Sequence, residues 1–320
     1  MKKRLLLLIL FLTFGLLTAC AGGNQTENAD HNGYQEAEQR ENKNVAFPVT
    51  VKDARGSEVV VEEKPERIVS LIPSNTETAF ALGLEKEIVG VSDHDNYPEE
   101  VEEKERVGGM ELNIEKIISL KPDLVLASEI NPQEGLQQLE DAGITVLVVN
   151  DAANFSDAYD SIKMIGEATG KLDEAEKIVQ GIKNKIKEIQ DQIGTDAEKK
   201  KVYVEVWPAP DISVAGKNTF IDEMLQLIGA ENIIKKEGWP KVDQEAVIEA
   251  DPDVIITTYG AYAGSDSDKE IPERDGWQDV TAVKNKQIYD VDNDTVTRPG
   301  PRLAEGIEEI AKAVYPEIFE

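Results

Sequence analysis

Three aromatic side chains of this chain stand directly before a proline, in Tyr97-Pro98, Trp207-Pro208 and Trp239-Pro240. Because proline disfavours the helical conformation at the preceding residue, each ring is expected on an extended or turn segment. Rings held in this way offer apolar faces to a ligand. Each ring alone also fits an ordinary packing role, so ligand binding and core packing remain alternatives at this point.

Asp294 and Arg298 form a second candidate group near the C-terminus. A surface ion pair between them would contribute only ~0 to 1 kcal/mol to stability. The prolines at positions 299 and 301 favour a loop of fixed course instead. In such a loop Arg298 would stay free to donate hydrogen bonds to carbonyl or amide oxygens.

Paired carboxylates such as Asp292 and Asp294 also suit acid–base hydrolysis, which needs two carboxyl groups at a set separation in a cleft. In a chain with 63 acidic residues, such neighbours arise by chance. The sequence contains no nucleophile elbow, phosphate-binding loop or zinc motif. We therefore expect no enzymatic activity, no resident cofactor and no metal site.

These candidates follow predicted β-strands. Pro73-Ser74-Asn75 comes after the strand 67–72, Trp207 after 201–206, and Asp294 after 287–291. In an open parallel sheet, ligands bind beyond the carboxyl ends of the strands, so we expect the candidates to meet there. Ser74 and Glu77 predict a capping box for the helix that follows, which should end at Gly83.

Two segments of the chain, 115–128 and 245–258, each predict a short helix, a Pro-Asp turn and a buried strand. Their unbroken apolar runs are typical of parallel strands that are covered on both faces. A β-hairpin is predicted at 47–61, and strands alternate with helices elsewhere. The sequence therefore predicts an α/β fold of two similar lobes with mostly parallel sheets.

A long amphipathic helix is predicted over residues 172–194, between an N-terminal lobe at 47–171 and a C-terminal lobe at 195–320. Its apolar stripe consists of Ala175, Ile178, Val179, Ile182, Ile186, Ile189 and Ile193. At a rise of ~1.5 Å per residue the helix is about 33 Å long, which is enough to connect and brace both lobes. Packing against a single lobe is the alternative.

The N-terminus predicts secretion and lipid attachment. Basic residues at positions 2–4 precede an apolar run at 5–17, which is typical of a secretory signal. Leu17-Thr18-Ala19-Cys20 resembles a lipobox, so we expect residues 1–19 to be removed and Cys20 to be lipidated. An ordinary signal that ends near a chance cysteine is the alternative. The polar segment 20–46 is predicted to be a disordered tether that leaves the protein anchored at the extracytoplasmic face of the cell membrane.

The formal net charge of −29 limits the partners. Such a surface repels phosphate backbones and anionic headgroups, so we expect no nucleic-acid partner and no membrane binding through a basic patch.

Over residues 47–320 the chain resembles the lipid-anchored substrate-binding proteins of ABC importers. The resemblance rests on Arg67-Ile-Val-Ser-Leu71, Pro73-Ser-Asn-Thr-Glu77, Asn96-Tyr-Pro98, Lys121-Pro-Asp-Leu-Val125, Gly229-Ala-Glu-Asn-Ile233, Trp239-Pro240 and Arg298-Pro-Gly-Pro-Arg302. The combination of Tyr97, Trp207, Trp239, Asp294 and Arg298 is similar to the cobalamin-binding branch. The resemblance implies a monomeric receptor that captures a corrinoid and delivers it to an ABC permease with its ATPase subunits.

The resemblance further implies that these five side chains and the loop Pro73-Ser74-Asn75 line a cleft between the lobes. A corrin is a broad ring edged with neutral amides, and it suits aromatic faces with a few donors and acceptors. This chain has Gly108-Gly109-Met110 and Ser128-Glu129 where family members can place further tryptophans. The predicted cleft therefore has fewer aromatic rings around its ligand than in those family members, and the choice among corrinoids stays undecided.

Glu115 and Glu245 occupy equivalent positions in the repeated segment, each two residues after a predicted helix cap, Asn113 or Asp243. An acid in the first turn of a helix is stabilised by ~0.3 to 1 kcal/mol through the helix dipole. The resemblance implies a further role, in which one glutamate on each lobe docks onto arginines of the permease.

A ferric siderophore or haem is the alternative cargo within the same family. Anionic siderophores require a basic cluster, and haem usually requires an axial ligand. The chain has two histidines, His31 in the tether and His94 near the predicted cleft. A lone histidine is more often a surface or packing residue, so the role of His94 stays open. A surface adhesin or scaffold would have no use for an aromatic cleft between two lobes.

Overall fold

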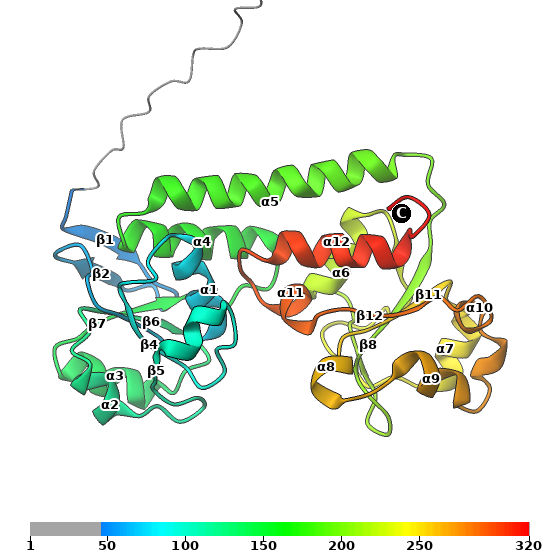
Figure 1. The fold of residues 1–320 in the computed structure, drawn as a ribbon, viewed down its shortest axis with the longest axis horizontal. Coiled ribbons are helices and arrows are strands. Elements are labelled where there is room, and N and C mark those ends of the chain that lie inside the picture. Colours follow the sequence, from blue (N-terminus) through cyan, green and yellow to red (C-terminus); the bar gives the residue numbers. More distant parts are fainter. Residues whose placement is uncertain (1–45, 320) are drawn as a thin grey trace, which may run out of the picture. The chain divides into compact units, whose positions relative to one another are not determined.

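The computed structural model describes residues 46–319. The predicted signal, Cys20 and the tether up to residue 45 lie outside this range. Within it the chain forms a short hairpin and two larger sheets, with one sheet in each lobe (Figure 1). Across these residues, no helix combines the length and the apolar character that a bilayer crossing requires.

The N-terminal lobe contains the predicted hairpin, β1 (Val49–Lys52) and β2 (Glu58–Val61), and a five-stranded parallel sheet in the order β5-β4-β3-β6-β7. The strands are β3 (Ile68–Ser70), β4 (Ile88–Val91), β5 (Glu105–Arg106), β6 (Leu124–Ser128) and β7 (Thr145–Val149). The helices are α1 (Pro73–Ala81), α2 (Ile114–Ser119), α3 (Gln133–Asp141) and α4 (Phe155–Ala168). The predicted alternation of strands and helices is confirmed.

The C-terminal lobe repeats this plan around a parallel sheet in the order β10-β8-β11-β12, to which β9 adds one antiparallel strand. The strands are β8 (Lys201–Trp207), β9 (Ser213–Val214), β10 (Glu231–Asn232), β11 (Val254–Thr257) and β12 (Ile288–Asp290). The helices are α6 (Phe220–Leu227), α7 (Gln244–Ala250), α8 (Gly260–Ala263), α9 (Ser267–Glu270), α10 (Thr281–Lys284), α11 (Asn293–Thr297) and α12 (Leu303–Val314). The segments 115–128 and 245–258 therefore take equivalent places, α2-β6 and α7-β11.

One hydrophobic core runs through both lobes. Its members include Leu126 of β6, Ile162 of α4, Ile182 of the long helix α5 (Leu172–Ile193), Val204 of β8 and Ile307 of α12. A second cluster covers the other face of the N-terminal sheet, and a third, which contains Trp277, covers the other face of the C-terminal sheet. Both sheets are thus covered on both faces, as their unbroken apolar runs predicted.

Helix α5 (Leu172–Ile193) packs against α4 of the N-terminal lobe and against α12 of the C-terminal lobe (Figure 1). Lys185 forms an ion pair with Glu308 of α12 at 3.0 Å. The Gln190 side chain donates to the Leu227 carbonyl of α6 at 2.8 Å. The alternative of a helix packed on one lobe is therefore wrong, and α5 braces both lobes.

The capping box predicted for α1 is wrong. Helix α1 begins at Pro73 after Ile72, and no side chain caps its first turn. Ser74 therefore lies inside the first turn and not at the cap position, and the carboxylate of Glu77 pairs with arginines of the other lobe. The predicted end of the helix is confirmed by Gly83, which has a φ of 76°.

The segment after β12 is a short helix, α11, and not the expected loop. Asp292 begins it, because its Oδ1 accepts a hydrogen bond from the backbone N–H of Asp294 at 2.8 Å. Asp294 and Arg298 are then one helical turn apart, and they form the ion pair that was the alternative to a free Arg298.

Candidate functional site

Two aromatic rings meet at the end of β8. Trp207, its last residue, is 52% exposed, and its ring centroid lies 5.9 Å from that of Tyr262 on α8 at an interplanar angle of 31°. The hydroxyl of Tyr262 donates to the carbonyl of Val206 at 2.6 Å and fixes this ring beside the strand. Trp207 and Tyr262 therefore present one aromatic surface, which we call the aromatic wall.

A buried ion pair holds strand β8, which carries Trp207 of the aromatic wall. Glu205, two residues before Trp207, is fully buried and accepts two bonds from Arg274, at 2.7 and 2.8 Å. The hydroxyls of Tyr203 and Tyr259 donate to the same carboxylate at 2.9 and 2.7 Å. Burial, together with this neighbouring carboxylate, raises the pKa of Tyr203. Because the charge of Glu205 is fully compensated, the ends of β8 and β11 are held in place.

Trp239 lies near the same edge of the C-terminal sheet. Ser213 pairs with Trp207 across strands β8 and β9, and its hydroxyl donates to the backbone carbonyl of Trp239 at 3.2 Å. The side chain of Trp239 is 49% exposed. The structure therefore brings two of the three predicted rings, Trp207 and Trp239, into one region.

A cavity of about 190 Å³ opens between the lobes. It is lined by Leu71, Ile72, Pro73, Ser74, His94, Gly109, Met110, Ile130, Asn131, Pro132, Asp151, Thr297, Arg298 and Pro299. Pro73, Ser74 and Arg298 are predicted site residues, and His94 lies at the cleft, as considered from the sequence. The cavity is smaller than the ~300 Å³ at which ligand pockets usually begin, so it is too small to enclose a drug-sized ligand by itself.

Asn75 does not line this cavity. It is buried, and its side-chain amide donates to the backbone carbonyl of Ala127 on β6 at 3.0 Å. The structure thus gives Asn75 a supporting position, in which it ties α1 to the sheet.

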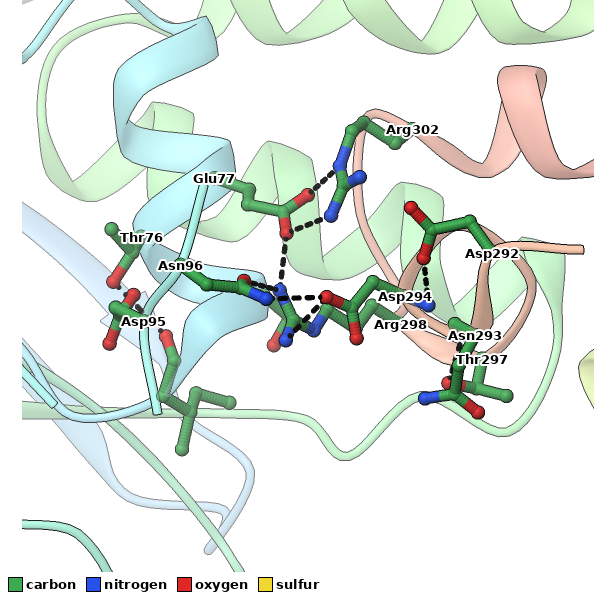
Figure 2. A network of polar contacts seen from close by, with 12 residues as sticks. Thr76, Glu77, Asp95, Asn96, Asp292, Asn293, Asp294, Thr297, Arg298 and Arg302 are labelled. Carbon is green, nitrogen blue, oxygen red and sulfur yellow. Dashed lines mark hydrogen bonds and ion pairs between the residues drawn. The ribbon is translucent and has the colours of Figure 1, made fainter. Parts of the chain in front are cut away.

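Glu77 links the two lobes. It is 3% exposed and lies on α1, while its partners lie in the C-terminal lobe (Figure 2). Arg302 donates to both of its carboxylate oxygens, at 2.8 and 2.7 Å, and Arg298 donates to one of them at 3.0 Å. Burial alone would lower the pKa of Arg302, but its bonds to Glu77 outweigh that effect and raise it. The buried charge of Glu77 is therefore compensated from across the lobes.

Asn96 extends this network with its side-chain carboxamide (Figure 2). Its Oδ1 accepts from Nη1 of Arg298 at 2.7 Å, and its Nδ2 donates to Oδ2 of Asp294 at 2.8 Å. Nη2 of Arg298 also pairs with Oδ2 of Asp294 at 2.9 Å. The expectation that Arg298 is free to donate is therefore wrong, because Glu77, Asn96 and Asp294 engage it.

Tyr97 lies apart from the aromatic wall. Its ring packs against the guanidinium group of Arg302, at 4.1 Å from the ring centroid. It lines a second cavity, of about 520 Å³, together with Glu77, Pro301 and Arg302. The predicted aromatic residues thus do not all face one cavity.

Comparison with known protein families identifies the family of this chain. A family model described as periplasmic binding protein matches residues 68–295. The chain belongs to this periplasmic binding protein family. An uncharacterized ABC transporter substrate-binding lipoprotein of Bacillus subtilis is 46% identical over 327 residues, which cover 100% of both chains. A cobalamin-binding protein of Halobacterium salinarum is 28% identical over 279 residues, which cover 84% of this chain and 75% of that protein.

Solved structures share the fold. A possible iron-binding, periplasmic solute-binding protein of Staphylococcus epidermidis has a TM-score of 0.72 and 39% identity, over 79% of this chain and 100% of that chain. A heme-binding protein of Roseiflexus sp. RS-1 has a TM-score of 0.70 and 27% identity, over 79% and 99%. The vitamin B12 binding protein of Vibrio cholerae has a TM-score of 0.66 and 27% identity, over 79% and 98%.

As a periplasmic binding protein, this chain binds a solute and is not an enzyme. The carboxylates considered for hydrolysis are engaged otherwise, since Asp292 caps α11 and Asp294 pairs with Arg298 and Asn96.

Glu115 and Glu245 are exposed in the first turns of α2 and α7, which are equivalent helices of the two lobes. Both predicted caps are confirmed. The side chain of Asn113 accepts from the backbone N–H of Lys116 at 3.0 Å, and that of Asp243 accepts from the N–H of Glu245 at 3.1 Å. This periplasmic binding protein thus presents an accessible carboxylate at the equivalent position of each lobe.

Four residues of this region, Tyr262, Asn96, Glu77 and Arg302, were not among the predicted site residues. Tyr262 follows β11, so the rule that found the candidates at other strand ends would have found it. Glu77 and Arg302 carried no such signal, because the positions that they pair are 225 residues apart.

Proposed function

We propose that this protein is the extracytoplasmic receptor of an ABC importer and that its cargo is a corrinoid. The observation that carries the proposal is the carboxamide of Asn96, held between Arg298 and Asp294. These two side chains offer one donor and one acceptor side by side. A primary amide supplies the complementary acceptor and donor, so the pair recognises amide chemistry.

This chemistry separates the candidate cargoes. A corrinoid carries primary amides around the edge of its ring. Haem carries propionate carboxylates, and a carboxylate beside Asp294 would meet a like charge. A polyanionic siderophore would also meet the net charge of −29. Arg298 and Asp294 therefore favour a neutral ring with amide groups.

Apolar surfaces for the faces of such a ring are available on both lobes. The aromatic wall and Trp239 supply them on the C-terminal lobe. Met110 and Ile130, which line the cavity between the lobes, are 72% and 59% exposed. These aliphatic side chains lie close to the positions where family members can place tryptophan. We expect them to contact the ring with less area than an indole would.

The cellular place of the receptor follows from the N-terminus and from a relative. Cys20 and the preceding residues resemble a lipobox, and the Bacillus subtilis relative is described as a substrate-binding lipoprotein of an ABC transporter. We propose that lipid on Cys20 anchors this protein outside the cell membrane, where a permease and its ATPase subunits accept the cargo.

Calorimetric titration of the purified protein with cobalamin, cobinamide, haem and a panel of ferric siderophores tests the cargo. We expect heat and a thermal shift with the two corrinoids and none with the others. Binding of haem or a siderophore, with no response to either corrinoid, would reject the corrinoid and retain the receptor. A lack of response to every compound would leave no support for this family of cargoes.

Reversal of both docking charges, Glu115→Lys together with Glu245→Lys, should abolish uptake and leave corrinoid affinity unchanged. Both carboxylates are exposed at helix ends, outside the residues that contact Arg298 and Asp294. The measurement pairs calorimetry on the purified variant with uptake of labelled cobalamin by cells.

A matched variant with the same change in charge controls for general electrostatics. Glu100→Lys together with Glu249→Lys alters one exposed acid on each lobe away from the first turns of α2 and α7. We expect this control to transport normally. Equal loss of uptake in both variants would show that Glu115 and Glu245 have no specific docking role.

A further inference from the structure

We infer that Asn96 is a displaceable internal ligand, whose carboxamide occupies the Arg298–Asp294 pair until an amide of the cargo replaces it. The inference rests on the proposed function and adds to it a residue that sets the threshold for cargo binding. It assigns Asn96 the role of a competitor, and not that of a cargo contact.

The geometry fixes the orientation of the Asn96 side chain. Arg298 can only donate, and ionised Asp294 can only accept, so Oδ1 must face the guanidinium group and Nδ2 must face the carboxylate. The distances of 2.7 and 2.8 Å are those of strong, charge-assisted hydrogen bonds. A cargo amide that made the same two bonds would need the positions that these atoms occupy.

Departure of Asn96 would leave no charge uncompensated. Arg298 keeps its ion pairs with Asp294 at 2.9 Å and with Glu77 at 3.0 Å. The Asn96 residue itself is exposed, so water can satisfy its amide after displacement. The exchange therefore replaces one amide by another at the same pair of charged groups.

The backbone next to Asn96 is held in place, so displacement requires rotation of a side chain and no movement of the loop. Asp95 is buried, and its Oδ2 accepts from the Ser92 hydroxyl at 2.6 Å. Arg106 donates to the backbone carbonyl of Asp95 at 2.8 Å. Rotamer changes of exposed side chains are fast, so Asn96 controls affinity without slowing access to the site.

The cargo can bind only those molecules in which Asn96 has left the Arg298–Asp294 pair. The apparent affinity is therefore the intrinsic affinity multiplied by the fraction of such molecules. Removal of the competitor should therefore tighten binding. Because the displaced Asn96 amide regains hydrogen bonds to water, the net difference is modest, and we expect Asn96→Ala to lower the Kd for cobinamide by about fivefold. A residue that contacts the cargo, or that holds the cleft in shape, would give the opposite sign.

The first experiment compares the wild type, Asn96→Ala and Asn184→Ala by calorimetry with cobinamide. Asn184 is an exposed asparagine of α5 and serves as the matched control. We expect tighter binding for Asn96→Ala alone. Unchanged or weaker binding in this variant, with a melting temperature equal to that of the wild type, overturns the inference.

The second experiment needs no corrinoid, so it separates failure of the inference from failure of the proposed function. The side-chain NH₂ resonances of Asn96 are followed by nitrogen-15 NMR in the wild type and in Asp294→Ala, which removes the acceptor and gives the reference signals of a released Asn96. Propionamide, or propionate as control, is then titrated into the wild type. We expect propionamide to move the wild-type signals toward those of Asp294→Ala, and propionate to leave them in place. Signals that propionamide does not move overturn the inference, whatever the cargo.

Discussion

Replacement of Glu77 by alanine should destabilise the protein by about 3–5 kcal/mol, which is the usual cost of removing one partner from a buried ion pair. The side chains of Arg302 and Arg298 are only 11% and 18% exposed, and both would lose their shared carboxylate. Urea unfolding measures the loss directly. The thermal midpoint should fall by roughly 10 °C for a domain of this size.

Two further variants make the result specific. Glu100→Ala removes an exposed glutamate of the same lobe and should change stability by less than about 0.5 kcal/mol. Glu77→Leu combined with Arg302→Met replaces the buried pair by apolar groups and should recover a large part of the loss. If Glu77→Ala were as mild as Glu100→Ala, the network between the lobes would contribute nothing to stability.

Trp207→Ala should weaken corrinoid binding by about 2 kcal/mol, or about thirtyfold in Kd, which is typical of a central aromatic contact. The ring is 52% exposed and lies against the tilted ring of Tyr262, so about half of its surface stays accessible to a ligand. We expect a similar loss for Trp239→Ala. Titration calorimetry with cobalamin gives both values.

Two matched variants test whether the loss of aromatic contact area causes the loss of affinity. Trp207→Phe keeps a ring beside Tyr262 and should lose less affinity than Trp207→Ala. Val60→Ala removes another exposed apolar side chain, on the β1-β2 hairpin, and should bind as the wild type does. Titration curves that are unchanged for both Trp207→Ala and Trp239→Ala would reject this site.

Local patterns predicted most of the fold. The apolar stripe of 172–194 gave the bounds of α5 within one residue, because a helix of that length repeats its signal over many turns. The repeated segments predicted α2-β6 and α7-β11 for the same reason. The strand-end rule also placed Pro73, Ser74, Trp207 and Arg298 near the site.

Pairing across the lobes could not be predicted in this way. Asn96 and Asp294 are 198 positions apart, and no local pattern indicates which of 63 acids is buried against which arginine. The capping box was wrong because the helix begins at Pro73, one residue before the serine that should have capped it. The carboxylate of Glu77 is bound instead by two arginines that lie far away in the sequence.

The core that runs through α4, α5 and α12 joins the same two lobes that Glu77 and its arginines connect. A molecule whose two lobes are joined at both places allows only small lobe movements, and its lobes do not swing apart as they would about a hinge. The distance between Glu115 and Glu245 should therefore be nearly the same in full and empty receptors.

If these residues dock, a permease would bind both forms with equal affinity, so empty receptors would occupy importers in competition with loaded ones. Uptake should then depend on the ratio of receptor to cargo, and should decline when the receptor is in large excess.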